Sequence, residues 1–219
     1  MADLTKENYD SLIESISQII LSKGLKATTM DSVAASLSMS KRTLYEIFDS
    51  KMDMIIKVVN FWQEQHCRDV KRIFDSSDNV LEAMFRVFTV HSRKINSVSL
   101  EFFRDMDYYF PEVREIFEKN NRFRSESLME VIRIGINQGV FREDVNYPVT
   151  FHLMRIQMES LKRMEKHFPP EISRMEALDT INIGFLRSIA SPEGNAILDK
   201  IYADYKKKNS ESNLNSLSS

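Results

Sequence analysis

The chain has 219 residues, a formal net charge of −2, five glycines, five prolines and one cysteine. The near-neutral charge means that any surface for nucleic acid must be a local patch, and a single cysteine excludes a disulfide within the chain. Scarce glycine and proline disfavour a sheet protein with its many turns. The polar start does not resemble a signal peptide, and no apolar run approaches the ~18 residues of a membrane span. We therefore expect a cytoplasmic protein without a membrane partner.

The first fifty residues are predicted to form three short helices. Isoleucines recur at helical spacing between 13 and 20, and Gly24 ends that pattern. A second apolar stripe follows at 33–37, with a threonine at 28 or 29 as its N-cap. After the break at 38–40, a third helix begins at Lys41, and its apolar residues Leu44 and Phe48 face the core.

The rest of the chain predicts longer helices and an all-α fold. A Ser/Asn-rich composition beyond residue 206 predicts a disordered tail. The expected domains are a helix-turn-helix domain at 1–50, a helical ligand-binding and dimerisation domain at 51–205, and a tail at 206–219. The predicted helices span 50–74, 81–95, 100–109, 111–138, 146–168, 172–190 and 195–205.

Residues 28–51 are the segment that points to a function. Two short helices joined by a tight turn place the second helix where it can enter a DNA major groove. Arginine can bridge guanine O6 and N7, threonine can meet a phosphate or a thymine methyl, and tyrosine commonly reaches a phosphate. A lysine that opens the following helix also suits a phosphate. The outward residues of these types are Lys41, Arg42, Thr43, Tyr45 and Lys51.

The same segment resembles the TetR family of transcriptional regulators. The resemblance lies in the helix before Gly24 and in residues 27–29, 33–34, 40–45 and 48–51, with weaker similarity at 138–145 and 184–189. It implies double-stranded DNA as the partner, homodimerisation and a ligand-sensing domain. It further implies phosphate contacts from Thr29, Tyr45 and Lys51 and an approach to bases by Lys41, Arg42 and Thr43, and Ser40 belongs to the same DNA-binding set.

Two positions depart from the family pattern. Ser38 stands where the family usually has glycine in the turn, and a positive φ there would cost serine on the order of 1 kcal/mol. Ile47 stands where many relatives carry histidine or another polar residue, so one family contact is expected to be missing. Glu46 and Asp49 bring negative charge near the DNA backbone, which is expected to sharpen selectivity against wrong sites.

Other interpretations of these residues remain open at this point. The three helices could be a plain structural bundle, Tyr45 could cover the edge of the core, and Lys41 could be a solvated lysine. Methionines and aromatics between 80 and 168 could form ordinary core or line a pocket for a small apolar or aromatic ligand. The pocket candidates are Phe88, His91, Phe103, Met106, Met154 and Met158.

No catalytic residue, cofactor site or metal site is predicted. The histidines at 66, 91, 152 and 167 lack metal-ligand spacing, and the chain has neither a phosphate-binding glycine loop nor a nucleophile elbow. The alternatives are a DNA-binding regulator without an effector and, from another class, an all-helical enzyme or metal-binding bundle.

The sequence as a whole predicts a repressor that a small ligand releases from a palindromic operator. It leaves open the operator sequence, the effector and the choice between repressor and activator. Two apolar stripes predict dimerisation through the last two long helices as a four-helix bundle. The stripes are Phe151, Met154, Met158 and Leu161, and Met175, Leu178, Phe185 and Ile189.

Overall fold

The computed structural model describes residues 5–216, apart from the side chains of 120–127, 165 and 208–216. This part of the chain is all-α, without a strand, and none of its helices is both long and apolar enough to cross a membrane. The helices are α1 (Lys6–Lys23), α2 (Met30–Ser36), α3 (Lys41–Ile47), α4 (Lys51–Asp75), α5 (Val80–Asn96), α6 (Leu100–Tyr109), α7 (Pro111–Asn137), α8 (Tyr147–Ser160), the 3-10 turn η1 (Leu161–Arg163), α9 (Met164–His167), α10 (Arg174–Ile189) and α11 (Pro192–Ser216).

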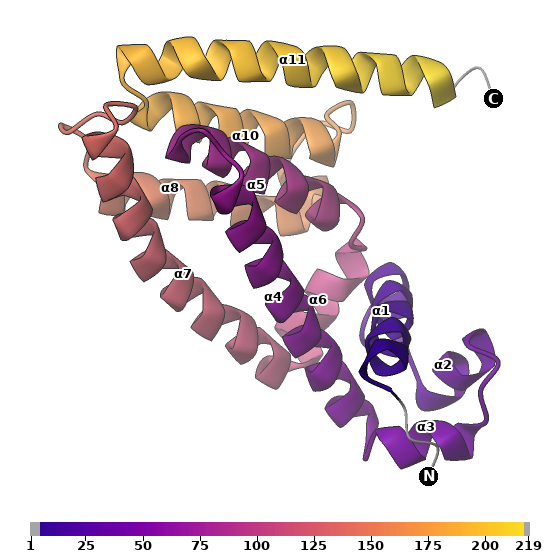
Figure 1. Cartoon of the computed structure of the whole chain (residues 1–219). Coiled ribbons are helices and arrows are strands. Elements are labelled where there is room, and N and C mark those ends of the chain that lie inside the picture. Colours follow the sequence, from indigo (N-terminus) through magenta and orange to yellow (C-terminus); the bar gives the residue numbers. More distant parts are fainter. Residues whose placement is uncertain (1–4, 217–219) are drawn as a thin grey trace.

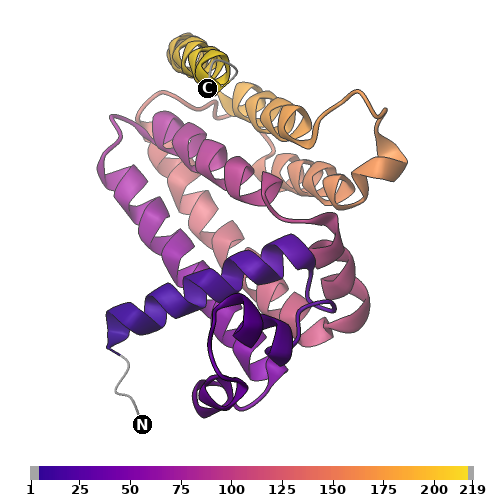
Figure 2. The ribbon, with the colours of Figure 1, turned by 90° about the vertical axis from the view of Figure 1, so that its right-hand side faces the viewer.

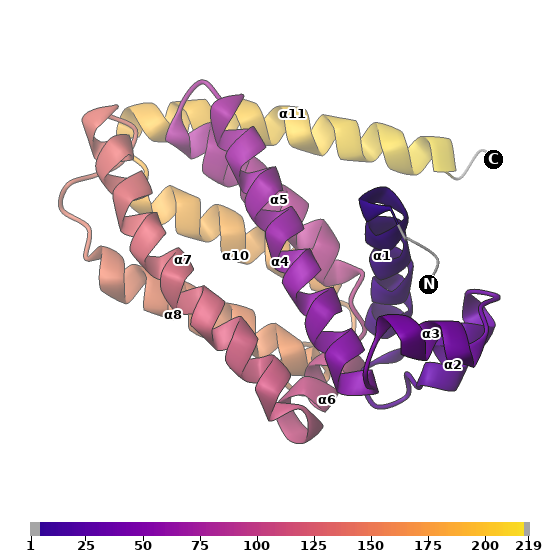
Figure 3. The same cartoon turned by 60° about the horizontal axis from the view of Figure 1, so that its bottom comes forward.

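The helices form a small head joined to a larger body. Helices α1 to α3 make the head, and α4 leads from it along the body to α5 (Figure 1). Helices α4 and α7 run side by side, with α6 beside the head at their lower end (Figure 3). Helices α8 and α10 pack on each other at the far end, and α11 lies beyond them (Figure 2).

Most helices begin at a small polar residue whose side chain satisfies a free backbone N–H of the first turn. Thr29 is the N-cap of α2, whereas Thr28 is buried and donates its hydroxyl to the Gly24 carbonyl at 2.7 Å. The N-caps whose side chains accept a backbone N–H are Thr5, Thr29, Ser40, Ser50, Asn79, Ser99, Asn146 and Ser173.

Two predicted helices differ from the structure. The segment 146–168 breaks after Ser160 into a 3-10 turn and a short helix, because this change of direction lets Leu161 and Met164 enter a core cluster with Leu178. Helix α11 extends to Ser216, beyond the expected end at 205 and through much of the expected disordered tail. No glycine or proline lies between 195 and 216 to end it.

The turn between α2 and α3 has the positive φ that was considered for Ser38, where the family usually has glycine. Ser38 has φ 53°, in the left-handed region that glycine adopts without a steric penalty. Its neighbour Met39 donates its N–H to the Ala34 carbonyl at 2.9 Å, which ends α2. Serine therefore occupies a strained turn position at which glycine would fit better.

The head shares its apolar core with the body. Leu44 of α3 and Phe48, which follows that helix, are fully buried, and the same cluster contains Phe102 and Met106 of α6 and Val113 of α7. The cluster thus crosses the predicted domain boundary at residue 50. A domain of this size buries a smaller share of its surface than a larger one does, and here the body adds to the core of the head.

Four of the eight side chains predicted for the dimer interface are buried within the chain, so these four are core residues and not interface residues. Leu161, Leu178, Phe185 and Ile189 are buried, and Phe151 lies 5.0 Å from Phe185 between ring centroids. The other predicted residues, Met154, Met158 and Met175, are partly buried. Helices α8, α10 and α5 pack together and use these stripes as their own core, which helical periodicity alone does not reveal.

A different apolar face of α8 is exposed instead. Val149, Leu153 and Ile156 are each more than half exposed and recur at helical spacing. Gly184 on the neighbouring α10 is exposed as well, with open space where a Cβ would stand. These four residues form what we call the outer α8/α10 face.

Replacing Ser38 with glycine is expected to stabilise the chain by about 0.5–1 kcal/mol, because the strain at positive φ is relieved. Urea unfolding monitored by circular dichroism measures the change. The matched control is Ser11→Gly on the exposed side of α1, where glycine should destabilise by a few tenths of a kcal/mol. Equal destabilisation by both changes would contradict the assigned strain.

Candidate nucleic-acid interface

The α2–turn–α3 unit presents a cationic face of α3, and the opposite face packs on the core of the head. The fully buried residues Leu44 and Phe48 anchor α3 to the core of the head. On the opposite side Lys41, Arg42 and Thr43 are exposed, as the spacing predicts. The helix therefore offers cationic and hydroxyl groups from a firmly packed scaffold.

Two of the predicted DNA-binding hydroxyls also hold the starts of α2 and α3. Thr29 Oγ1 accepts the Ser32 N–H at 3.1 Å, and Ser32 Oγ accepts the Thr29 N–H at 2.9 Å. Ser40 Oγ accepts the Thr43 N–H at 3.0 Å and lies 2.8 Å from Thr43 Oγ1. Both Thr29 and Ser40 are exposed, so they combine a structural role with access to an outside acceptor.

The two exposed cations of α3 are paired with carboxylates. Lys41 Nζ lies 2.7 Å from Asp31 Oδ1, and this hydrogen bond raises the pKa of Lys41. Arg42 Nε donates to Glu46 Oε1 at 3.1 Å, although the Arg42 side chain is 89% exposed. Exposed pairs of this kind contribute little to stability, so a phosphate or base edge can compete with the carboxylates. The sequence alone indicates that Glu46 lies near DNA but does not identify Asp31 as the carboxylate that pairs with Lys41.

Tyr45 and Lys51 are the remaining two residues of the predicted DNA-binding set. Tyr45 is 47% exposed, which leaves its ring accessible beside Arg42. Lys51 is only partly exposed, and its ammonium donates to the Lys26 carbonyl at 3.1 Å. Burial lowers the pKa of Lys51, and the charge of Asp105 opposes that shift. Because an ammonium has three N–H donors, the contact with Lys26 does not exhaust them.

The start of α4 carries acidic as well as basic groups. Ser50 caps the helix by accepting the Asp53 N–H at 3.1 Å, and Asp53 Oδ2 accepts the Asp49 N–H at 3.0 Å. A hydrogen bond from Lys57 lowers the pKa of Asp53. Lys57 also donates to the carbonyl of Ile47 at 3.3 Å. Ile47, which stands where many family members have a polar residue, is half-buried. The Asp53 carboxylate is therefore held in place by the Asp49 N–H and the Lys57 ammonium.

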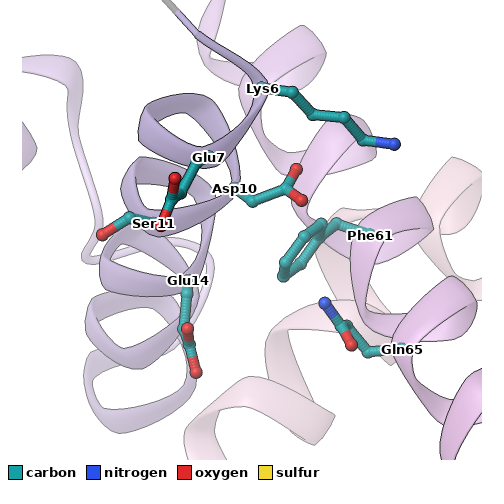
Figure 4. A pocket seen from close by; sticks show the side chains of 7 residues that line it. All are labelled: Lys6, Glu7, Asp10, Ser11, Glu14, Phe61 and Gln65. Atoms are coloured by element: carbon teal, nitrogen blue, oxygen red, sulfur yellow. The ribbon is translucent and has the colours of Figure 1, made fainter.

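An acidic groove of about 530 Å³ lies on another side of the head, between α1 and α4. Asp10 points toward Phe61 across this groove, with Glu7 and Glu14 along the same side of α1 (Figure 4). Three carboxylates against one lysine, Lys6, disfavour a nucleic-acid phosphate. The charge of this groove therefore favours α3 over the groove as the surface for DNA.

The predicted ligand-binding residues are divided among several parts of the core. Phe103 and Met106 belong to the cluster shared with the head, whereas Phe88 and Met154 pack in a second cluster and Met158 in a third. His91 lies 5.3 Å from His66 between ring centroids. Phe88 lines a cavity of about 10 Å³, which is room for one water molecule. The structure thus spreads these six residues over three apolar clusters and the contact of His91 with His66, and does not gather them into one site.

Metal ligands do not cluster in the part of the chain that the structure describes. Among residues 5–216, with the side-chain gaps given above, no three His, Cys, Asp or Glu residues are placed to share an ion. Cys67 is a free, exposed thiol.

Comparison with known proteins agrees with this geometry. Residues 12–58, which include all of α2 and α3, match the model of the family described as bacterial regulatory proteins, tetR family. The head and the start of α4 thus belong to the TetR family of transcriptional regulators. The family match spans the cationic face of α3 and the start of α4.

Relatives of this TetR-family regulator extend the similarity into the body. The HTH-type transcriptional repressor KstR2 of Mycolicibacterium smegmatis is 21% identical over 150 residues, covering 67% of this chain and 73% of the relative. The structure of the ketosteroid transcriptional regulator KstR2 of Mycobacterium tuberculosis aligns with a TM-score of 0.56 at 19% identity, over 85% of this chain and 97% of that one.

A second solved structure is similar in fold. A putative transcriptional regulator from Saccharomonospora viridis, in complex with choline, aligns with a TM-score of 0.62 at 19% identity, over 85% of this chain and all of that one. The family and these relatives are transcriptional regulators rather than enzymes.

Proposed function

We propose that this TetR-family regulator is a repressor that binds a palindromic operator as a homodimer. The observation that carries the proposal is the exposed cationic face of α3, held in place by the buried residues Leu44 and Phe48. A relative that matches two thirds of the chain is named as a repressor, which favours repression over activation.

In this proposal α3 enters the major groove, and some side chains contact bases while others contact phosphates. Arg42 exchanges Glu46 for the acceptors of a guanine, and Lys41 and Thr43 approach neighbouring bases or phosphates. The phosphate contacts come from Thr29, Ser40, Tyr45 and Lys51, which position the head without reading sequence. Residues 1–50 form the DNA-binding domain and residues 51–205 the ligand-binding and dimerisation domain.

The outer α8/α10 face is the proposed dimer interface. An isologous pairing would bring α8 and α10 of each chain together and cover Val149, Leu153 and Ile156. The three side chains are exposed in a single chain, and apolar residues gathered on one helix face favour a protein partner. In the dimer the two copies of α3 would enter successive major grooves, about 34–36 Å apart.

A small effector that binds the body is proposed to release the DNA. Support comes from the aromatic and methionine content of the body and from two proteins of similar fold, one named for ketosteroids and one bound to choline. An effector must bind the two conformations of the dimer with different affinity, since otherwise no population shifts.

Truncation of Arg42 and truncation of Lys51 are expected to change DNA binding in different ways. Arg42→Ala should cost about 1–3 kcal/mol on the operator and relax selectivity at one base per half-site. Lys51→Ala should weaken binding to all duplexes alike and reduce the salt slope by about one for each phosphate that the lysine neutralises. Operators selected from random duplexes, and scrambled versions of them, provide the DNA for binding measurements across a salt series.

The control for this pair is Arg68→Ala, an exposed arginine that likewise faces a glutamate one turn away on its helix, in α4 beyond the head. It should leave both DNAs bound as before. Equal weakening of operator and scrambled DNA by Arg42→Ala, with altered base preference in Lys51→Ala, would reverse the assigned roles.

Charge on the outer α8/α10 face is expected to prevent dimerisation. Leu153→Glu should turn the dimer into a monomer at micromolar concentration, because a buried interface does not accommodate an unpaired carboxylate. Sedimentation velocity measures the change. Met129→Glu on α7, which also adds a charge at an exposed apolar residue, should remain dimeric. A Leu153→Glu dimer would place the interface elsewhere.

Release of the operator by an effector can be tested on the intact dimer. Addition of a ketosteroid, or of choline, to the operator complex should lower the bound fraction if the site accepts that class of ligand. Fluorescence anisotropy of labelled operator follows the release, with a duplex-bound protein outside this family as the control for nonspecific effects. Complete retention with both classes would favour a regulator that does not respond to either.

A further inference from the structure

Residue Lys26, in the loop between α1 and α2, is held by two helices at once. Its backbone N–H donates to Asp105 Oδ2 of α6 at 2.7 Å, and its carbonyl accepts from Lys51 Nζ of α4 at 3.1 Å. Its own ammonium lies 4.2 Å from the ring centroid of Tyr109, also on α6. The backbone N–H and the carbonyl of Lys26 therefore both bind side chains from helices of the body.

The loop also packs closely against α6. Gly24 has φ +87°, and a Cβ added there would stand 2.8 Å from Asp105 Oδ2 and 3.2 Å from Glu101 Cβ. Asp105 is 8% exposed, so its carboxylate is largely out of water. A buried carboxylate is costly unless it is hydrogen-bonded, and the Lys26 N–H supplies such a bond.

The restraint continues from the loop into the DNA-binding unit. The Thr28 hydroxyl donates to the Gly24 carbonyl at 2.7 Å, and the next residue, Thr29, is the N-cap of α2. The loop that Asp105 holds thus leads directly into the helix on which α3 packs. A shift of α6 would carry the loop and the start of α2 with it.

We propose that Asp105 is a positioning residue for the DNA-binding head, which it orients against the body by holding the Lys26 amide. Lys51 is its counterpart on α4, because it holds the carbonyl of the same residue. The proposal rests on the proposed function as a DNA-binding regulator. Asp105 itself does not touch DNA, so it acts on affinity only through the orientation of α2 and α3.

The test compares three variants of the full-length protein. Asp105→Ala removes the acceptor, Asp105→Asn removes the charge but keeps an oxygen that can accept the Lys26 N–H, and Asp107→Ala is a matched control. Asp107 lies two residues further along α6 and loses the same charge when truncated. Hydrogen exchange at the Lys26 amide and affinity for selected operator DNA are measured for each.

In Asp105→Ala the Lys26 amide should exchange at least about tenfold faster, and operator affinity should fall by about tenfold, because a charge-assisted hydrogen bond is removed. Asp105→Asn should restore most of both quantities, and Asp107→Ala should match the unmodified protein. Exchange in α10 should be unchanged in all three, which separates a local change in the loop from general unfolding.

Two results would overturn the proposal. One is unchanged exchange at Lys26 in Asp105→Ala, and the other is faster exchange with unchanged operator affinity. Failure of the proposed function is a separate outcome, because the unmodified protein would then select no DNA while the exchange experiment would still report on the hydrogen bond. A loss of affinity in Asp105→Asn equal to that in Asp105→Ala, with the Lys26 amide still protected, would assign the effect to charge and not to positioning.

Discussion

The structure depends on an apolar core that the head of about fifty residues shares with the body. Leu44 of α3 and Phe48, which follows it, are fully buried in a cluster to which α4, α6 and α7 also contribute. The helix with the cationic face is therefore supported by the body and not only by its neighbour α2. A single core that spans head and body also explains why α6 reaches the loop at Lys26.

Local charge, and not net charge, distinguishes the side of the molecule that is proposed to bind DNA. The chain as a whole is slightly acidic, and the groove along α1 gathers carboxylates. On α3 the cations are present but paired, Lys41 with Asp31 and Arg42 with Glu46. Such pairs weaken the attraction to any duplex, so binding depends more on contacts that replace both carboxylates together.

The body uses its methionine and aromatic residues in more than one way. Five of the six residues predicted to line one pocket are shared among three apolar clusters, and seven of the eight predicted to form the dimer interface belong to two of these clusters. The exposed apolar residues Leu153 and Ile156 are on the same helix as the buried stripe but on its other side. Hydrophobic periodicity shows that a helix has an apolar face but not what covers it.

The sequence by itself determined the local features of this protein. The three short helices of the head, a threonine N-cap at 28 or 29 and the outward residues of α3 follow from neighbours a few residues apart, whereas the resemblance to a family pattern raised the question of strain at Ser38. Short-range rules of capping, periodicity and backbone sterics are enough for these.

Only the tertiary structure decided the long-range features. The bond from Lys26 to Asp105 joins residues 79 positions apart, and the contact of Lys51 with the Lys26 carbonyl joins residues 25 positions apart. Neither pairing leaves a periodic signal in the sequence, and the side of α8 that faces inward depends on how α5 and α10 pack against it. These contacts arise from the shape of the shared core, which exists only when the distant helices have come together.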